Sequence, residues 1–294
     1  MKKRITVLYL IVLNILIVSS CSNDDDNDSQ SSDMIPLTLE LENLGELTNG
    51  ANYEGWIIVD NVPVSTGKFT DNALNQTFMV NKANLEKATE FLVSIEPRDD
   101  SDAGPSTTKI LGGMFDNDAA LLTTNKVASD FSNISGKFVI ATPTDNNGSN
   151  EEFGVWFMDP TGFAGLAPSL NLPVLSEGWK YEGWVVLNDK SVSTGTFTMI
   201  DASDDAALYS DTAVAPPNYP GEDFLSSAPR GLIFPADGEV VKKQVFITIE
   251  PNPDYDQATP FSLMLLNVNA GPSVSPVLNT MEPVNKIPSG KALR

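Results

Sequence analysis

The chain has 294 residues, of which 41% are apolar, and it carries a formal net charge of −21 with no histidine and one cysteine. Such an acidic surface repels nucleic acid, so no DNA or RNA partner is expected. Without histidine, neither a Ser-His-Asp or Cys-His nucleophile nor a common zinc site can form, and one cysteine excludes an intramolecular disulfide. We therefore expect a non-enzymatic protein of about two domains, without metal or other cofactor, stabilised by packing alone.

The first residues have the three parts of a signal peptide. Basic residues at positions 2–4 precede a mostly apolar run over 7–18, which is too short to span a bilayer. The small residues of "VSSC" then lead to Cys21, and this arrangement resembles a bacterial lipobox. We expect removal of residues 1–20 and acylation of Cys21, because two or more acyl chains anchor a protein stably in a membrane. The alternative is an ordinary signal peptide or an anchor with a chance cysteine.

The segment "SNDDDNDSQSSD" follows the cysteine. It has no apolar residue to bury, which predicts a disordered acidic tether over residues 21–35. Its aspartates lack the glycine turn and spaced ligands of a calcium loop, so no calcium site is expected there. An acidic run after a lipid-carrying cysteine resembles the surface-export tag of lipoproteins in some Gram-negative lineages. We therefore expect an outer-membrane lipoprotein exposed at the surface, and a periplasm-facing orientation is the alternative.

Short apolar runs broken by turn residues come next, and they predict strands. Residues 35–44 alternate as a half-buried strand does, and 53–59 form a continuous aromatic and β-branched run typical of a strand between two layers. Residues 64–70 complete a hairpin, in which Gly67 indicates a bulge. Residues 81–91 have room for two helical turns before the next strand begins.

The same sequence then occurs a second time. "YEGWIIVDNVPVSTGKFT" begins at Tyr53 and "YEGWVVLNDKSVSTGTFT" at Tyr181, and the strands "FLVSIEP" and "VFITIEP" end in Glu96-Pro97 and Glu250-Pro251. The copies lie 128 residues apart at the first block and 154 apart at the second. This pattern predicts a tandem duplication of an all-β unit, with each copy forming a β-sandwich.

The boundaries of the copies follow from the turn-rich segment 159–173. "GKFVIATPTD" and "FGVWFMDP" are expected to be strands that close the first copy. We therefore place one β-sandwich over residues 36–160 and a second over 170–292. The different spacing of the two blocks indicates an inserted loop at 199–240 in the second copy, and such loops are often functional.

The motif pattern resembles the C-terminal domain of anti-sigma-K factors, in which an aromatic strand leads to a "G.F" strand and later to a "V.(V/T).EP" motif. The matching residues are Trp56, Gly67, Phe69, Ser94, Glu96 and Pro97 in the first copy, and Trp184, Gly195, Phe197, Thr248, Glu250 and Pro251 in the second. The resemblance implies an extracytoplasmic sensory or regulatory module. The cytoplasmic sigma-binding segment and the transmembrane helix that precede this domain in the family are not seen here, so direct sigma inhibition is not expected.

Few side chains are candidates for function. Tyr53, Trp56, Tyr181 and Trp184 are expected in the cores rather than as stacking platforms for a sugar or peptide. Glu54 and Glu182 are expected on a solvated face or in cross-strand pairs. Glu96 and Glu250 are expected to bond turn amides, with ligand contact or acid/base glycoside chemistry as alternatives.

The inserted loop holds the remaining candidates. Tyr219 and Phe224 lie among prolines and are the candidates for partner contact if the loop is exposed. "DTA" resembles a short O-glycosylation motif, which makes Thr212 a possible glycan site.

Taken together, the sequence predicts a lipoprotein anchored through Cys21 that senses, binds or adheres to an extracellular or periplasmic protein or glycan. A regulatory protein that binds the periplasmic part of an anti-sigma system is the alternative, and a carboxylate-based hydrolase is the third hypothesis.

Overall fold

The computed structural model describes residues 33–70 and 75–294. These residues form an all-β structure with two similar sandwich-like sheets and one short helix, as the sequence predicts. Among the described residues, no helix has the length and apolar character needed to cross a membrane. The predicted signal peptide, Cys21 and most of the predicted tether lie outside the described residues.

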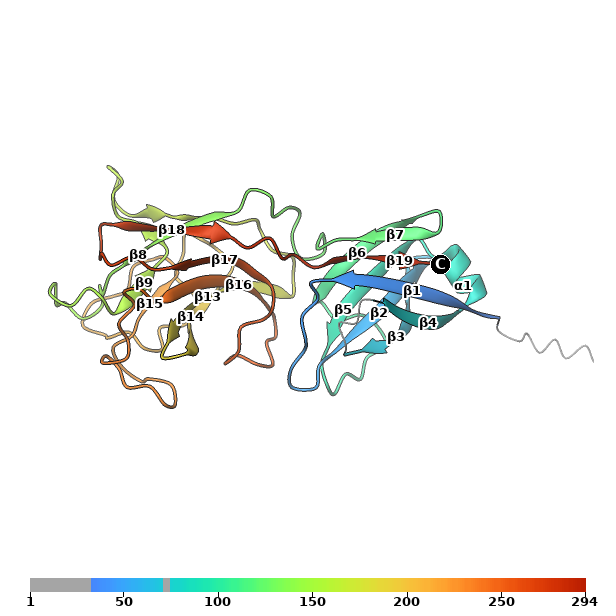
Figure 1. Ribbon diagram of the computed structural model, residues 1–294, viewed down its shortest axis with the longest axis horizontal. Helices are drawn as coiled ribbons and strands as arrows, with labels where there is room; N and C mark the ends of the chain where they lie inside the picture. The colour runs from blue at the N-terminus through green and yellow to red at the C-terminus, as the bar shows by residue number, and fades with distance from the viewer. Residues whose placement is uncertain (1–32, 71–74) are drawn as a thin grey trace, which may run out of the picture. The chain divides into compact units, whose positions relative to one another are not determined.

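The first sheet has eight strands in the order β3-β2-β5-β6-β7-β19-β1-β4 (Figure 1). Its elements are β1 (Met34–Glu42), β2 (Asn52–Val59), β3 (Val62–Phe69), β4 (Asn75–Asn81), α1 (Lys82–Lys87), β5 (Glu90–Glu96), β6 (Lys109–Asp116), β7 (Ala119–Leu122) and β19 (Ser289–Leu293).

The second sheet repeats this arrangement in the order β14-β13-β16-β17-β18-β8-β9-β15, with β12 also paired to β8. Its elements are β8 (Ser135–Ile140), β9 (Gly154–Trp156), β12 (Leu170–Asn171), β13 (Trp179–Leu187), β14 (Lys190–Phe197), β15 (Gly221–Asp223), β16 (Gln244–Pro251), β17 (Met264–Asn269) and β18 (Leu278–Pro283). The strands β10 (Met158–Asp159) and β11 (Ala167–Pro168) form a separate pair.

The expected strands and the bulge are present. The hairpins β2–β3 and β13–β14 shift register at the same place, and the extra residues there are Thr66 and Thr194. The following glycines have positive φ angles, 139° at Gly67 and 113° at Gly195, which side chains rarely adopt. The helix α1 supplies the expected helical turns before β5. The strand β1 already begins at Met34, inside the expected tether.

The duplicated aromatic residues separate onto two faces of each sheet. Tyr53 and Tyr181 are buried in the main core, and their hydroxyls donate to the carbonyls of Gly45 and Pro173. The matching tryptophans, Trp56 and Trp184, are also buried, but they point to the opposite face. All four residues are thus buried as expected. The tryptophan indoles also donate to buried hydroxyls, and the ring of Trp184 stacks on Phe246 with 6.2 Å between the ring centroids.

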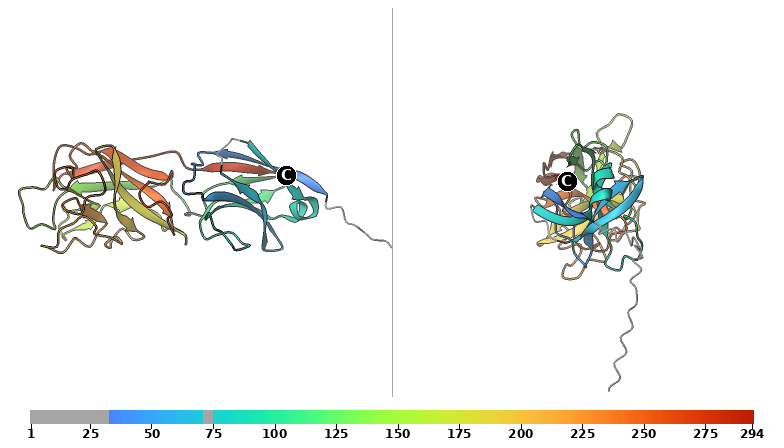
Figure 2. Two further views of the ribbon diagram at one scale, coloured as in Figure 1. Left: turned by 90° about the horizontal axis from the view of Figure 1, so that it is seen from below. Right: turned by 90° about the vertical axis from the view of Figure 1, so that its right-hand side faces the viewer.

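The two sheets exchange one strand with each other. β8 follows β7 in the chain, yet it pairs with β18 in the second sheet, while β19 follows β18 and pairs with β7 and β1 in the first sheet. The left view of Figure 2 agrees with this exchange, because the red C-terminal strand lies among blue and green strands there.

The sequence supports the view that these two strands are equivalent. β8 contains Ser135-Gly136-Lys137 and β19 contains Ser289-Gly290-Lys291, and the two motifs are 154 residues apart, the same spacing as Glu96 and Glu250. Gly136 and Gly290 occupy matching positions, since each lies opposite a leucine of the sheet it joins. We interpret each strand as the last strand of its own copy, placed in the sheet of the other copy.

This exchange corrects the expected assignment of strands. "GKFVIATPTD" and "FGVWFMDP" were expected to close the first copy, within 36–160, but β8 and β9 belong to the second sheet, and β19 at the end of the chain belongs to the first. Aromatic packing explains the difference. Phe157, which follows β9, lies 6.2 Å from Phe138 of β8 and 6.5 Å from Phe197 of β14, measured between ring centroids.

The bulge glycine gives a first testable prediction. A Cβ atom at Gly195 would lie 2.6 Å from the carboxyl carbon of Asp204, and φ there is 113°. We expect Gly195→Ala to lower the free energy of unfolding by about 2 kcal/mol, through strain and the steric clash together. Urea unfolding measures this, with Ser191→Ala on the same strand as the control. Equal stability of the two variants would contradict the strained geometry.

Candidate functional site

A chain of buried hydrogen bonds connects a tryptophan to the Glu-Pro corner of each sheet. In the first sheet the Trp56 indole N–H donates to the Ser94 hydroxyl over 2.7 Å, and Ser94 donates to Glu96. Glu96 also accepts the backbone N–H of Ser106 at 3.0 Å, and its side chain is buried. The carboxylate therefore holds the loop that follows its strand.

The second sheet repeats these contacts with equivalent residues. Trp184 donates to the Thr248 hydroxyl over 2.8 Å, and Thr248 donates to Glu250. Glu250 accepts the backbone N–H of Phe261 at 3.0 and 3.1 Å. The interpretation that Glu96 and Glu250 bond turn amides is thus confirmed, and both glutamates are 1% exposed.

A second glutamate lies beside each of these networks. Glu54 and Glu182 are 5% and 4% exposed, so the expected solvated face is wrong. Their partners lie on the neighbouring strand, where the hydroxyls of Ser65 and Ser193 donate to them. The expected cross-strand pairing is therefore confirmed for both residues.

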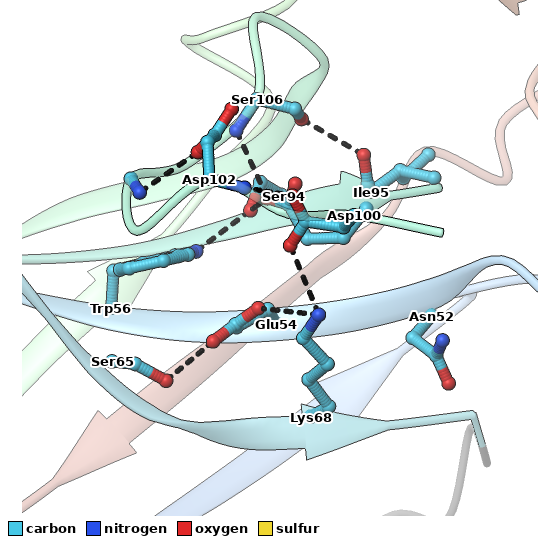
Figure 3. Close-up of polar contacts among 12 residues, drawn as sticks. Asn52, Glu54, Trp56, Ser65, Lys68, Ser94, Ile95, Asp100, Asp102 and Ser106 are labelled. Atoms are coloured by element: carbon cyan, nitrogen blue, oxygen red, sulfur yellow. Dashed lines mark hydrogen bonds and ion pairs between the residues drawn. The ribbon is translucent and has the colours of Figure 1, made fainter. Parts of the chain in front are cut away.

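The first sheet places a cation among these carboxylates. The Lys68 ammonium lies 3.0 Å from an Asp100 oxygen and 3.5 Å from a Glu54 oxygen, and Figure 3 shows it between the two side chains. The hydrogen bond from Lys68 lowers the pKa of Asp100 below its usual value. Lys68 thus offsets the negative charge of this cluster.

The second sheet has the same carboxylates without this cation. Thr196 lies opposite Glu182, in the register position that Lys68 occupies opposite Glu54. Oxygen atoms of Glu182, Glu250 and Asp254 lie within 4.8 Å of one another. Burial raises the pKa of Glu182 to about 8 and that of Glu250 to about 7.

A cavity of about 180 Å³ adjoins this carboxylate cluster. Apolar walls come from both copies and include Leu47, Ile95 and Phe261, while Glu250 and Asp254 also line it. Hydrogen bonds between the copies frame it: Thr48 donates to Asp256 over 2.7 Å, and Asn49 donates to the Tyr255 carbonyl over 2.8 Å. The cavity is large enough for one side chain or a small molecule rather than an oligosaccharide.

The inserted loop at 199–240 is built into the second sheet. Its strand β15 pairs with β9, and the buried Asp223 accepts hydrogen bonds from the Trp156 indole at 2.7 Å and the Thr144 hydroxyl at 2.6 Å. Phe224 is completely buried against Tyr209 and Phe234, so the suggestion that it contacts a partner is corrected. The ring is needed to pack the loop onto the sheet.

Tyr219 and Thr212 keep some contact with solvent. Tyr219 is half-buried, and its hydroxyl donates to the Leu166 carbonyl over 2.8 Å. Thr212 is exposed, and its backbone N–H donates to Asp211. Partner contact by Tyr219 and glycosylation of Thr212 stay predictions.

The burial of Phe224 predicts a large effect on stability. Phe224→Ala is expected to cost about 3–5 kcal/mol of unfolding free energy, as is usual for a fully buried ring. Tyr219→Phe, the control in the same loop, loses one hydrogen bond and is expected to cost about 1 kcal/mol. Thermal unfolding distinguishes the two, and a Phe224→Ala protein as stable as the control would contradict the packing described.

Part of the candidate site was missed by sequence reasoning. Asp100 and Asp254 lie 154 residues apart, as Glu96 and Glu250 do, so both copies keep the acidic residue after the Glu-Pro corner. The substitution of Thr196 for Lys68 was the remaining signal, and it is visible in the aligned repeats. Neither spacing nor composition shows that these side chains converge, because that depends on the register of β13 with β14 and β16.

Comparison of the chain with protein-family models, curated proteins and solved structures gives no significant match. The resemblance to the anti-sigma-K domain therefore stays a prediction from the motifs quoted above.

Proposed function

We propose that the chain is a non-enzymatic lipoprotein, anchored through Cys21 and displayed at the outer membrane, whose two sandwiches bind a ligand or partner outside the cytoplasm. The single structural observation that supports binding is the cavity between the copies, which has apolar walls and the acidic residues Glu250 and Asp254 at its surface. The lipobox and the acidic tether of the sequence support the location.

The shape and charge of the cavity suggest the chemistry of what it binds. Its volume of about 180 Å³ is below the range of drug-sized sites, so it suits one protruding side chain or a small molecule. Glu46 and Asp256 also line the cavity, and such acidic groups beside apolar walls favour a cationic group with an apolar stem. A protein or peptide partner that inserts a basic side chain fits this description better than a neutral glycan.

Carboxylate-based hydrolysis is a second candidate, and the convergence of Glu182, Glu250 and Asp254 favours it. Two observations weigh against it. Glu182 does not line the cavity, so a substrate there would not lie between the two glutamates. The carboxylates of Glu182 and Glu250 are also held by Ser193, Thr248 and the backbone of residue 261. Turnover of a glycan or peptide by the purified protein, lost in Glu250→Gln, would replace our proposal with this one.

Protease treatment of intact cells tests the location. We expect external protease to degrade the protein while a periplasmic control survives, and we expect Cys21→Ser to abolish incorporation of labelled palmitate. Survival of the protein until the outer membrane is broken would contradict surface display. It would favour the alternative, a regulatory protein that binds the periplasmic part of an anti-sigma system.

A further inference from the structure

We propose that Glu182, Glu250 and Asp254 bind one divalent cation, and that Ca²⁺ is the ion that suits this set of ligands. All three residues belong to the second copy, so cation binding there does not depend on the lipid anchor or on the side of the membrane on which the protein lies.

The first observation is the geometry of the three carboxylates. They come from two neighbouring strands and the loop that follows, and one oxygen from each lies within 4.8 Å of the others. Glu182 is 4% exposed and Glu250 is 1% exposed, so little water is available to screen their repulsion. Buried carboxylates this close require a shared proton, a cationic side chain or a metal ion.

The second observation is the equivalent cluster in the first sheet, where a cation is present. Glu54, Glu96 and Asp100 correspond to Glu182, Glu250 and Asp254, and the Lys68 ammonium lies 3.0 Å from Asp100 and 3.5 Å from Glu54. Lys68 is the cross-strand neighbour of Glu54, as Thr196 is of Glu182. The first copy thus places a positive charge among these three carboxylates. The second copy has the same carboxylates but lacks the lysine.

No other basic side chain in the described residues replaces the missing lysine. Lys180 lies on the same strand as Glu182, but it forms an ion pair with Asp205. The hydrogen bond from Ser193 reaches only one oxygen of Glu182, Oε1, and its Oε2 accepts none from a described residue. This side chain is more than nine-tenths buried, and one of its two oxygens lies within 4.8 Å of carboxylate oxygens of Glu250 and Asp254.

The identity of the ion follows from the ligand atoms and their access to solvent. All three ligands are carboxylate oxygens, which favour hard cations over the softer transition metals. Glu250 and Asp254 line the cavity, so water can complete a coordination sphere of six to eight oxygens. Ca²⁺ tolerates such an irregular, partly hydrated site better than Mg²⁺ does, and an affinity of about 10⁻⁴ M is typical of extracellular calcium modules.

Calorimetric titration of CaCl₂ into the detergent-purified full chain, at pH 7.5 and in 0.15 M NaCl, tests the proposal. We expect one ion per chain. Thr196→Lys should place an ammonium where Lys68 places one, and it should weaken binding at least tenfold while leaving the protein folded. Glu182→Gln keeps the volume of the side chain and should also weaken binding. MgCl₂ in place of CaCl₂ should bind at least tenfold more weakly.

The reciprocal variant is the matched control. Lys68→Thr removes the cation of the first sheet and should leave the Ca²⁺ site of the second sheet unchanged. The acidic tether is intact in every variant, so Ca²⁺ binding that persists in both Thr196→Lys and Glu182→Gln would belong to the tether or to the general surface charge. That result, or no binding to the wild-type chain at millimolar Ca²⁺, would overturn the proposal.

Discussion

Deletion of residues 285–294 is expected to unfold the first sheet, although nearly all of that sheet is encoded by the opposite end of the chain. β19 lies between β7 and β1, pairing with four residues of the former and five of the latter. Its Ala292 is completely buried in the core. The deletion removes backbone hydrogen bonds worth about 1 kcal/mol each and leaves the edges of β7 and β1 unpaired. The free energy of unfolding of the first sheet should therefore fall by more than about 5 kcal/mol. A loss of this size is comparable to the whole stability of a typical domain.

Hydrogen exchange followed by mass spectrometry measures the effect sheet by sheet. We expect peptides from β1 and β7 to lose protection first, while β13 and β16 keep theirs. The control is Arg294→Ala, which removes the hydrogen bonds of this guanidinium to Leu85, Ala88 and Asn117 but leaves the strand in place. A synthetic peptide of residues 285–294 should restore protection. Uniform loss across both sheets, or no loss, would contradict a separable role for β19 in the first sheet.

The exchanged strands mark the limit of what the sequence could predict. Local signals identified most of the longer strands, the bulge at Gly67 and the duplication, because each depends on residues close together in the chain. The destination of a strand depends instead on packing between distant segments. β8 and β19 have nearly the same sequence at their starts, so either sheet offers each of them a similar partner edge.

The candidate site shows the same limit on a smaller scale. The repeat pointed to Glu96 and Glu250 and to their turn amides, which the fold confirms. The repeat did not show that the carboxylate of Glu182 lies beside that of Glu250. A single glutamate within an apolar strand gives a similar sequence pattern whether the strand is half-buried or fully buried. The burial of Phe224 was missed for a related reason, because a loop rich in proline and glycine does not show from its sequence whether it is exposed or packed onto a sheet.

The stability of the second sheet should fall as the pH rises from about 4.5 to 8. Burial is the main cause that raises the pKa of Glu182 to about 8 and that of Glu250 to about 7, whereas both return to about 4.5 in the unfolded chain. Between these values the folded state binds more protons than the unfolded state, so raising the pH favours unfolding. The contribution of Glu182 and Glu250 to the free energy of unfolding is fully present below about pH 4.5 and is lost by about pH 8.

Other charged groups face this cluster and define the control. Lys180 is paired with Asp205, and burial raises the pKa of Asp254, against which the backbone N–H of Asp256 donates a hydrogen bond that lowers it. Burial raises the pKa of Asp204, elsewhere in the second sheet, to about 8. This residue therefore also lowers the free energy of unfolding as the pH rises. The change of the wild-type unfolding free energy with pH therefore combines several groups. Only a variant at the cluster isolates the contribution of Glu182 and Glu250.

Thr196→Lys is that variant, because an ammonium beside Glu182 and Asp254 should lower their pKa values as Lys68 lowers that of Asp100. Each unit of pKa difference between the folded and unfolded states corresponds to about 1.4 kcal/mol. The wild-type chain should therefore lose several kcal/mol of unfolding free energy between pH 5 and 9, and the Thr196→Lys variant should lose clearly less. Lys68→Thr should steepen the loss in the first sheet. Urea midpoints at pH 5, 7 and 9 in EDTA measure all three proteins. Parallel curves for wild type and Thr196→Lys would mean that the carboxylates of the second sheet are already neutralised by something other than protons.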